Sequence, residues 1–196
     1  MLELDIGSKT MNKIVRYFIF AGLMISLVSF IIPEKKLQKL IGKIWSDQEV
    51  EVHQLDLPDS LVKDLNQLYE VKANGEVIGY ACFNTAFGCR VGGCAAPSNP
   101  NALSYETFDY YVIYDTDLKI KKVDIANYGG QYGYEICRAK WLKQFQGKTD
   151  GFALNDDIDG VSGATVSAQF LVDDLNAVGH TLKSIDLSSF SSLVSQ

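Results

Sequence analysis

The chain has 196 residues, of which 47% are hydrophobic, 11% aromatic and 21% charged. That is enough for one medium domain with an appendage, and the composition is ordinary for a globular protein. Residues 1–45 carry seven Lys and Arg against three acids (+4), whereas residues 46–196 carry eleven against twenty-one (−10). An acidic body lacks the basic footprint of nucleic-acid binding, which excludes that class. The basic, apolar head indicates instead a membrane anchor on a soluble domain.

The head contains the longest apolar run. The nineteen residues from Ile14 to Ile32 include a single charge, Arg16, and about 20 residues are needed to span a bilayer. A cleaved signal peptide is the alternative, but the run ends at Pro33 without the small residues of a cleavage site. We therefore expect a tail over residues 1–13, a single-pass anchor over 14–32, and a stalk and linker over 33–60. Lysines on both sides of the span leave its orientation open.

The first elements after the anchor follow from spacing and turn chemistry. Apolar residues recur at helical spacing between Lys36 and Trp45, with lysines among them, which predicts a helix, either an interfacial stalk or a continuation of the anchor helix. Residues 46–60 are acidic and unperiodic, as expected of a linker. A short helix is predicted over Ser60–Leu68. A hairpin is predicted around Asn74-Gly75, because both residue types tolerate the positive φ of a type I′ turn.

The rest of the domain alternates strands, loops and helices. Two β-rich runs, Tyr110–Tyr114 and Ile120–Ile125, predict strands, and the glycine- and tyrosine-rich segment Tyr128–Tyr134 predicts a loop. Ala139–Gln146 is expected to form a short helix. Strands that come first, with helices interspersed late, indicate an α+β fold. We expect one domain over residues 61–196, with a twisted, mainly antiparallel sheet and flanking helices.

The strongest periodic signal is a last helix from about Thr165 to Lys183. Its apolar residues fall three and four positions apart on one face, and Asp173 and Asp174 are expected to point away from that face. The run Asp159-Gly160-Val161-Ser162-Gly163-Ala164-Thr165 directly precedes it. On one interpretation, Ser162 or Thr165 is only a helix cap. On another, the small Gly163 and Ala164 leave the Thr165 hydroxyl uncrowded, and the positive helix end stabilises a phosphate beside it.

The run Asp-x-x-Ser-Gly-Ala-Thr resembles the flavinylation motif of the FMN-binding domain family. That family includes the membrane-anchored flavin subunits of Rnf complexes and of the sodium-pumping NADH:quinone oxidoreductase. The resemblance implies that a dedicated FMN transferase moves FMN from FAD onto Thr165 as a phosphoester, with Asp159, Ser162, Gly163 and Ala164 as the recognition run. Trp141-Leu142-Lys143-Gln144-Phe145-Gln146-Gly147-Lys148 is similar to the family's Trp-x-x-Gln-Phe-x-Gly-Lys helix.

The resemblance implies a flavin electron carrier in the cell membrane, with its domain outside the cytoplasm and membrane redox subunits as partners. Tyr132, Tyr134 and Trp141 are candidates for stacking on the flavin ring, with ordinary packing as the alternative for each. Two segments depart from the family pattern: residues 127–134, and the loop that holds Cys89 and Cys94. We expect such a chain to be an electron-carrier subunit of an oxidoreductase rather than a complete enzyme.

Four cysteines allow two disulfides outside the cytoplasm, and at least one is expected: Cys82, Cys89, Cys94 and Cys137. Two other functions stay open at this point. The flavin domain could act as a stand-alone reductase with a soluble acceptor. Alternatively, the chain could be a disulfide-stapled binding module, in which Ser162 or Thr165 is only a cap.

Overall fold

The computed structural model describes residues 31–90 and 105–191. In chain order its elements are α2 (Ile31–Ile44), β1 (Val50–Leu55), β2 (Gln67–Ala73), β3 (Glu76–Arg90), β4 (Tyr105–Asp115), β5 (Ile120–Tyr128), α3 (Ala139–Leu142), α4 (Thr165–Ser184) and α5 (Leu187–Ser191). Short 3₁₀ turns flank α3 at Tyr134–Cys137 and Lys143–Phe145. The fold is α+β, as expected.

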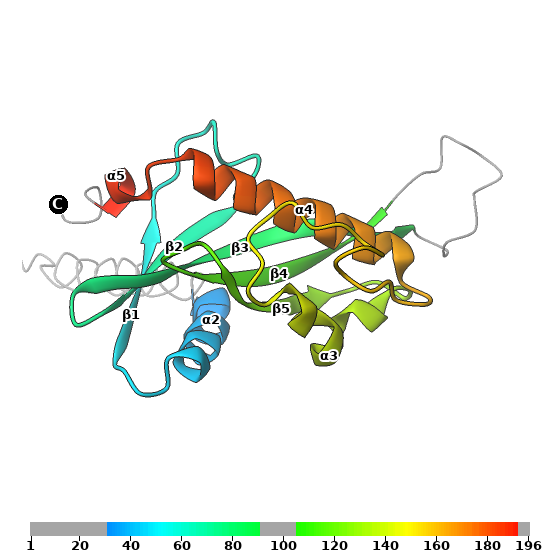
Figure 1. Ribbon diagram of the computed structural model, residues 1–196, viewed down its shortest axis with the longest axis horizontal. Helices are drawn as coiled ribbons and strands as arrows, with labels where there is room; N and C mark the ends of the chain where they lie inside the picture. Colours follow the sequence, from blue (N-terminus) through cyan, green and yellow to red (C-terminus); the bar gives the residue numbers. More distant parts are fainter. Residues whose placement is uncertain (1–30, 91–104, 192–196) are drawn as a thin grey trace, which may run out of the picture. The chain divides into compact units, whose positions relative to one another are not determined.

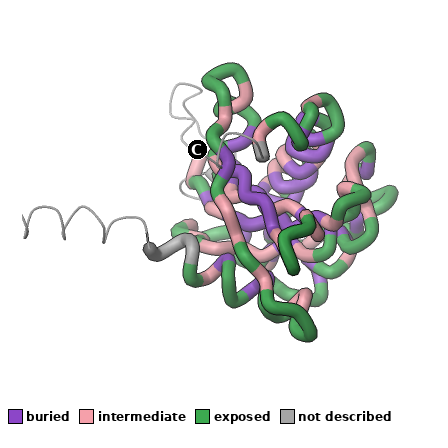
Figure 2. The backbone as a smooth tube through the Cα atoms, turned by 90° about the vertical axis from the view of Figure 1, so that its left-hand side faces the viewer, coloured by how far each residue is buried: buried purple, intermediate pink, exposed green. Residues whose placement is uncertain are grey.

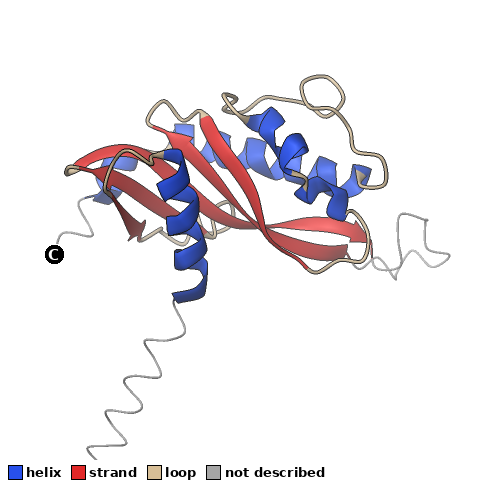
Figure 3. Ribbon diagram, turned by 90° about the horizontal axis from the view of Figure 1, so that it is seen from below, coloured by secondary structure: helices blue, strands red, loops and turns tan. Residues whose placement is uncertain are grey.

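The five strands form one antiparallel meander in the order β1-β2-β3-β4-β5. Asn74 and Gly75 have φ of 52° and 81°, so the predicted β2–β3 hairpin turn is confirmed. Register shifts interrupt three of the four pairings, between β2 and β3, β3 and β4, and β4 and β5. Such bulges increase local twist, and the long central strands are visibly twisted (Figure 3).

The helix α4 lies along one face of the sheet against β3, and α3 lies beside β5 (Figure 1). The core fills the space between α4 and the sheet. It contains Tyr110, Val112 and Tyr114 from β4, packed with Leu171 and Leu175 from α4. Burial therefore runs through the central strands and along the sheet-facing side of α4 (Figure 2).

Two local expectations are wrong. Residues 60–64 of the predicted helix Ser60–Leu68 form turns, and β2 begins at Gln67. Leu61, Leu65 and Leu68 mimic helical spacing, but Leu65 and Leu68 are buried in the core from a turn and a strand. Strand β1 lies inside the segment predicted to be a linker, where it pairs with β2 along its whole length.

The helix predicted between Lys36 and Trp45 is confirmed within α2, and the predicted last helix is confirmed as α4. The role of α2 as a stalk stays a prediction. The expected anchor, residues 14–32, falls outside the described part of the chain except for Ile31 and Ile32. Over residues 31–90 and 105–191, no helix has both the length and the apolarity that a bilayer span requires.

Candidate functional site

The motif run forms a tight turn that enters α4. Gly163 has a φ of 86°, a left-handed conformation that side chains rarely adopt, and Ala164 is fully buried behind it. The amide of Ala164 donates to the carbonyl of Val161 at 3.1 Å. Thr165 is then the first residue of the helix, and its side chain is exposed. Thr165 is thus exposed to solvent, directly after the buried Ala164 that anchors the turn.

The cap of α4 bears directly on the two interpretations of the motif. The N-cap residue is Ala164, and no side chain caps the helix. Among the residues that the structure describes, neither Ser162 nor Thr165 makes a side-chain hydrogen bond. The interpretation of either residue as a helix cap is therefore wrong. The first amides of a helix have no intrahelical acceptor, so this end of α4 can stabilise an external anion.

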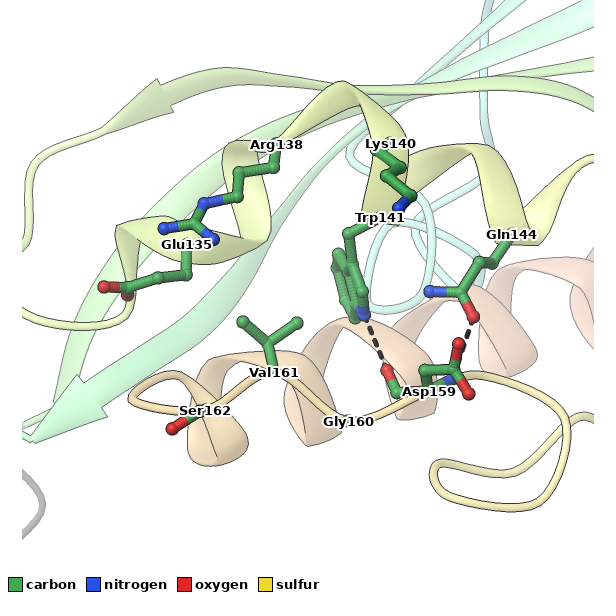
Figure 4. Close-up of a pocket in the computed structure, with 9 residues that line it drawn as sticks. All are labelled: Glu135, Arg138, Lys140, Trp141, Gln144, Asp159, Gly160, Val161 and Ser162. Carbon is green, nitrogen blue, oxygen red and sulfur yellow. Dashed lines mark hydrogen bonds between the residues drawn. The ribbon is translucent and has the colours of Figure 1, made fainter.

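The motif is held by the segment 141–148, called here the tryptophan helix, which includes the end of α3 and the 3₁₀ turn after it. The Trp141 indole Nε1–H donates to the carbonyl of Asp159 at 2.7 Å, and the Asp159 amide donates to Gln144 Oε1 at 2.9 Å (Figure 4). Both bonds go to the backbone of one residue, so they fix the start of the motif against α3. Trp141 and Gln144, three positions apart, thus both hold the backbone that leads into the turn before Thr165.

A cavity of about 390 Å³ lies between the tryptophan helix and the motif (Figure 4). Its walls carry charges of both signs, from Glu135, Arg138, Lys140 and Asp159, with Trp141 and Ser162 among the other lining residues. Thr165 is not among them. The Oε2 atom of Glu135 is buried, and within the described ranges it has no hydrogen-bond partner.

Thr165 instead lines a second cavity, of about 280 Å³, on the flank of α4. The other lining residues are Tyr105, Val166, Gln169 and Phe170. Tyr105 and Phe170 meet edge to face, with ring centroids 5.4 Å apart, and Phe87 packs against both at 6.0 Å and 5.6 Å. Thr165 therefore borders an aromatic surface built from β3, β4 and α4.

Of the three predicted ring-stacking residues, Trp141 is a packing residue. It is 7% exposed, meets Phe145 edge to face at 5.3 Å, and uses its N–H to hold the motif. Tyr132 and Tyr134 are 45% and 59% exposed and line neither of these two cavities. Sequence reasoning did not single out Phe87, Tyr105 and Phe170. A usable signal was Phe170, a large aromatic residue that lies outside the buried stripe of α4.

The tyrosine- and glycine-rich loop crosses directly over the first turn of α4. The Tyr128 hydroxyl lies 2.9 Å from the buried Ser167 Oγ, and Ser167 donates to Cys89 Sγ at 3.5 Å. A Cβ added at Gly133 would lie 2.4 Å from Ser167 Oγ, so only glycine fits this crossing. Burial raises the pKa of Tyr128, and the hydrogen bond with Ser167 opposes that shift. The loop is thereby joined to the helix that carries Thr165.

The cysteines divide by position. Cys82 is a buried free thiol in β3, and burial raises its pKa. Two disulfides need all four cysteines, so that alternative is wrong. Cys94 lies outside the described residues, and the expectation of at least one disulfide stays a prediction. Cys89 is buried under the loop described above, whereas Cys137 is exposed.

No protein-family model matches the chain, and no curated protein matches it either.

Proposed function

We propose that this chain is a membrane-anchored electron-transfer flavoprotein that carries FMN through a phosphoester to Thr165. The observation that carries the proposal is the entry to α4. An exposed threonine hydroxyl stands at the uncapped start of a 20-residue helix, on a turn whose base is buried. The resemblance to the flavinylation motif identifies the group that this position would take.

The residues present fit that group. The phosphate of a Thr165 phosphoester would lie at the positive end of the α4 dipole, where first-turn amides are available as donors. Gly163 has no side chain and Ala164 is buried, so neither crowds the Thr165 hydroxyl. Thr165 also lines a mainly apolar cavity with two aromatic walls. When bound, FMN supplies the ability to accept and pass on electrons, and the protein supplies attachment, orientation and exclusion of water.

Attachment follows a balanced exchange in this proposal. The Thr165 oxygen bonds to the FMN phosphorus of FAD, the phosphoanhydride bond breaks, AMP leaves with the bridging oxygen, and the hydroxyl proton passes to solvent. A separate FMN transferase performs the step. Thr165 is then a tether and not a catalytic residue. The N–H of Trp141 and the Oε1 of Gln144 act through Asp159 as positioning groups for the turn.

The acceptor test uses the full chain produced with and without an FMN transferase. Intact-mass spectrometry is expected to find one added FMN, less one water, only when the transferase is present. Thr165→Ala should abolish the adduct, and Thr165→Ser should retain it because the hydroxyl remains. Thr107→Ala is the matched control, since Thr107 is also exposed but lies on β4. An unmodified wild-type chain, or an adduct that survives Thr165→Ala, would refute the proposal.

The anchor is a separate part of the proposal and rests on the apolar run from Ile14 to Ile32. The full chain should remain in the membrane pellet after alkaline carbonate extraction, which releases peripheral proteins. Release into the supernatant would refute the anchor and leave the attachment of FMN untouched. A protease applied to sealed cells or vesicles then reports the side of the membrane, which is expected to be extracytoplasmic.

A further inference from the structure

Three aromatic rings gather on the surface beside Thr165. Phe87 comes from β3, Tyr105 from β4 and Phe170 from α4. Their centroids lie 5.4 to 6.0 Å apart, within the usual range for interacting rings. We call these three residues the aromatic cluster. None of them belongs to the core between α4 and the sheet.

The aromatic cluster is only partly covered. Phe87 is 54% exposed, and Tyr105 and Phe170 are half-buried. Leaving large rings in water forgoes the stabilisation that their burial brings, about 25 cal/mol per Å² of apolar surface. A contiguous exposed aromatic surface on an otherwise acidic domain commonly marks a binding site. The question is which ligand covers it.

We infer that the cavity walled by Tyr105 and Phe170, with Phe87 behind them, is the seat of the isoalloxazine ring of the FMN carried on Thr165. This inference rests on the proposed function and adds the position of the ring. Thr165 itself lines that cavity, so the attachment point and the proposed seat are contiguous.

The tether has the right reach. Phe170 follows Thr165 by five positions, which corresponds to a rise of about 7.5 Å along the helix and a rotation of about 140° around it. The two residues nevertheless line the same cavity, together with Val166. The five-carbon ribityl chain and the phosphate of FMN extend over a length comparable to the rise. The ring can therefore reach Phe170 through that cavity while its phosphate stays at the start of the helix.

The larger cavity beside Trp141 is the competing seat, and the structure disfavours it. Thr165 does not line it, and two carboxylates, Glu135 and Asp159, stand in its walls with Arg138 and Lys140. The indole there is already packed edge to face on Phe145, with its N–H bonded to the Asp159 carbonyl. The isoalloxazine is flat and aromatic, so it gains more from stacking on the aromatic cluster than from this mixed-charge wall.

The test measures flavin fluorescence of the covalently loaded full chain, with loading established first by intact mass. A tyrosine in contact with an isoalloxazine ring quenches its emission by electron transfer. Unfolding the wild-type protein in guanidinium should therefore raise its fluorescence several-fold. Tyr105→Leu should remove most of that quenching in the folded state. Phe170→Leu, which keeps an apolar side chain, should shift the flavin absorption bands and the midpoint potential.

Tyr80→Leu is the matched control, because Tyr80 is a half-buried tyrosine, as Tyr105 is, and lines neither cavity. It should leave the fluorescence, absorption and potential unchanged. Unchanged spectra in both Tyr105→Leu and Phe170→Leu would overturn the inference. So would a response to Trp141→Phe alone, which would place the ring in the other cavity. A change only in the rate of electron exchange with a partner would assign the aromatic cluster to docking and also overturn it. Absence of any adduct on the wild-type chain would instead overturn the proposed function, and with it this inference.

Discussion

A carboxylate between α4 and the sheet offers the sharpest test of how the helix is held. The Tyr110 hydroxyl donates a hydrogen bond to Asp174 Oδ2, and Asn84 Nδ2 donates to the same oxygen at 3.4 Å. Asn84 also donates to the carbonyl of Asp64 at 2.8 Å. Burial raises the pKa of Asp174, the bonds from Tyr110 and Asn84 oppose the shift, and the nearby Asp64 adds to it. The net direction is upward.

The perturbation is Tyr110→Phe, which keeps the buried ring and removes only the hydroxyl. A hydrogen bond to a charged group contributes about 1.5–3 kcal/mol, so the free energy of unfolding should fall by about that amount at neutral pH. The loss should shrink in acid. The folded-state pKa of Asp174 lies above its ordinary value of 3.8. At a pH between these two values, the folded protein therefore holds a proton on Asp174 that the unfolded chain has released. The stability from this group is therefore largest below the ordinary pKa and is lost as pH rises through the folded pKa.

Urea unfolding of wild type, Tyr110→Phe and Asp174→Asn over a series from about pH 4 to pH 7 measures both effects. The stability of Asp174→Asn relative to wild type should improve as pH rises, because the variant has no carboxylate to desolvate. Tyr134→Phe removes a hydroxyl from an exposed ring and should change nothing. A Tyr110→Phe cost that is equal at all pH values, or an Asp174→Asn difference that does not vary with pH, would refute the electrostatic argument.

Three further outcomes are expected. Gly133→Ala should lower stability by about 1–3 kcal/mol in thermal unfolding, because its φ is 87° and the new Cβ would lie 2.4 Å from Ser167 Oγ; Gly129→Ala, with open space around it, should be near neutral. Trp141→Phe removes the N–H that holds the motif and should lower the free energy of unfolding by about 0.5–1.5 kcal/mol. It should also slow flavin attachment in a mass-spectrometric time course, and an unchanged rate would argue against a positioning role. The Cys82 thiol, buried and with a raised pKa, should resist alkylation in the native protein and react only after unfolding, as peptide mapping would show.

Local signals predicted the parts of the fold whose causes are local. Asn74 and Gly75 set the hairpin turn by their backbone freedom, and the apolar stripe of α4 set that helix by its period. Strand β1 escaped prediction because it is an edge strand of mixed polarity. Its strand conformation comes from pairing with β2, a tertiary cause that residues 50–55 do not show by themselves.

Within the site, sequence reasoning placed Thr165 correctly at the start of a helix. It did not predict that Trp141 and Gln144 bind the backbone of the motif at Asp159. It could not find the aromatic cluster, because Phe87, Tyr105 and Phe170 are far apart in the chain and meet only through strand register and helix packing. Asp174 was expected to point away from the apolar face of α4, and that expectation is wrong. Its carboxylate faces the sheet because Tyr110 and Asn84 offer it donors there.

The way α4 is held constrains what the proposed flavin can do. Thr165 starts the helix, Ser167 ties its first turn to Tyr128, and Asp174 ties its middle to β4. Because α4 is fixed at Ser167 and at Asp174, Thr165 cannot shift independently of β3 and β4, which carry Phe87 and Tyr105. The phosphoester alone would leave the ring of FMN free to swing on its ribityl chain. On the proposed arrangement the strands limit that swing, so substitutions at Tyr105 should change the midpoint potential more than the conservative Thr165→Ser change, which keeps the tether.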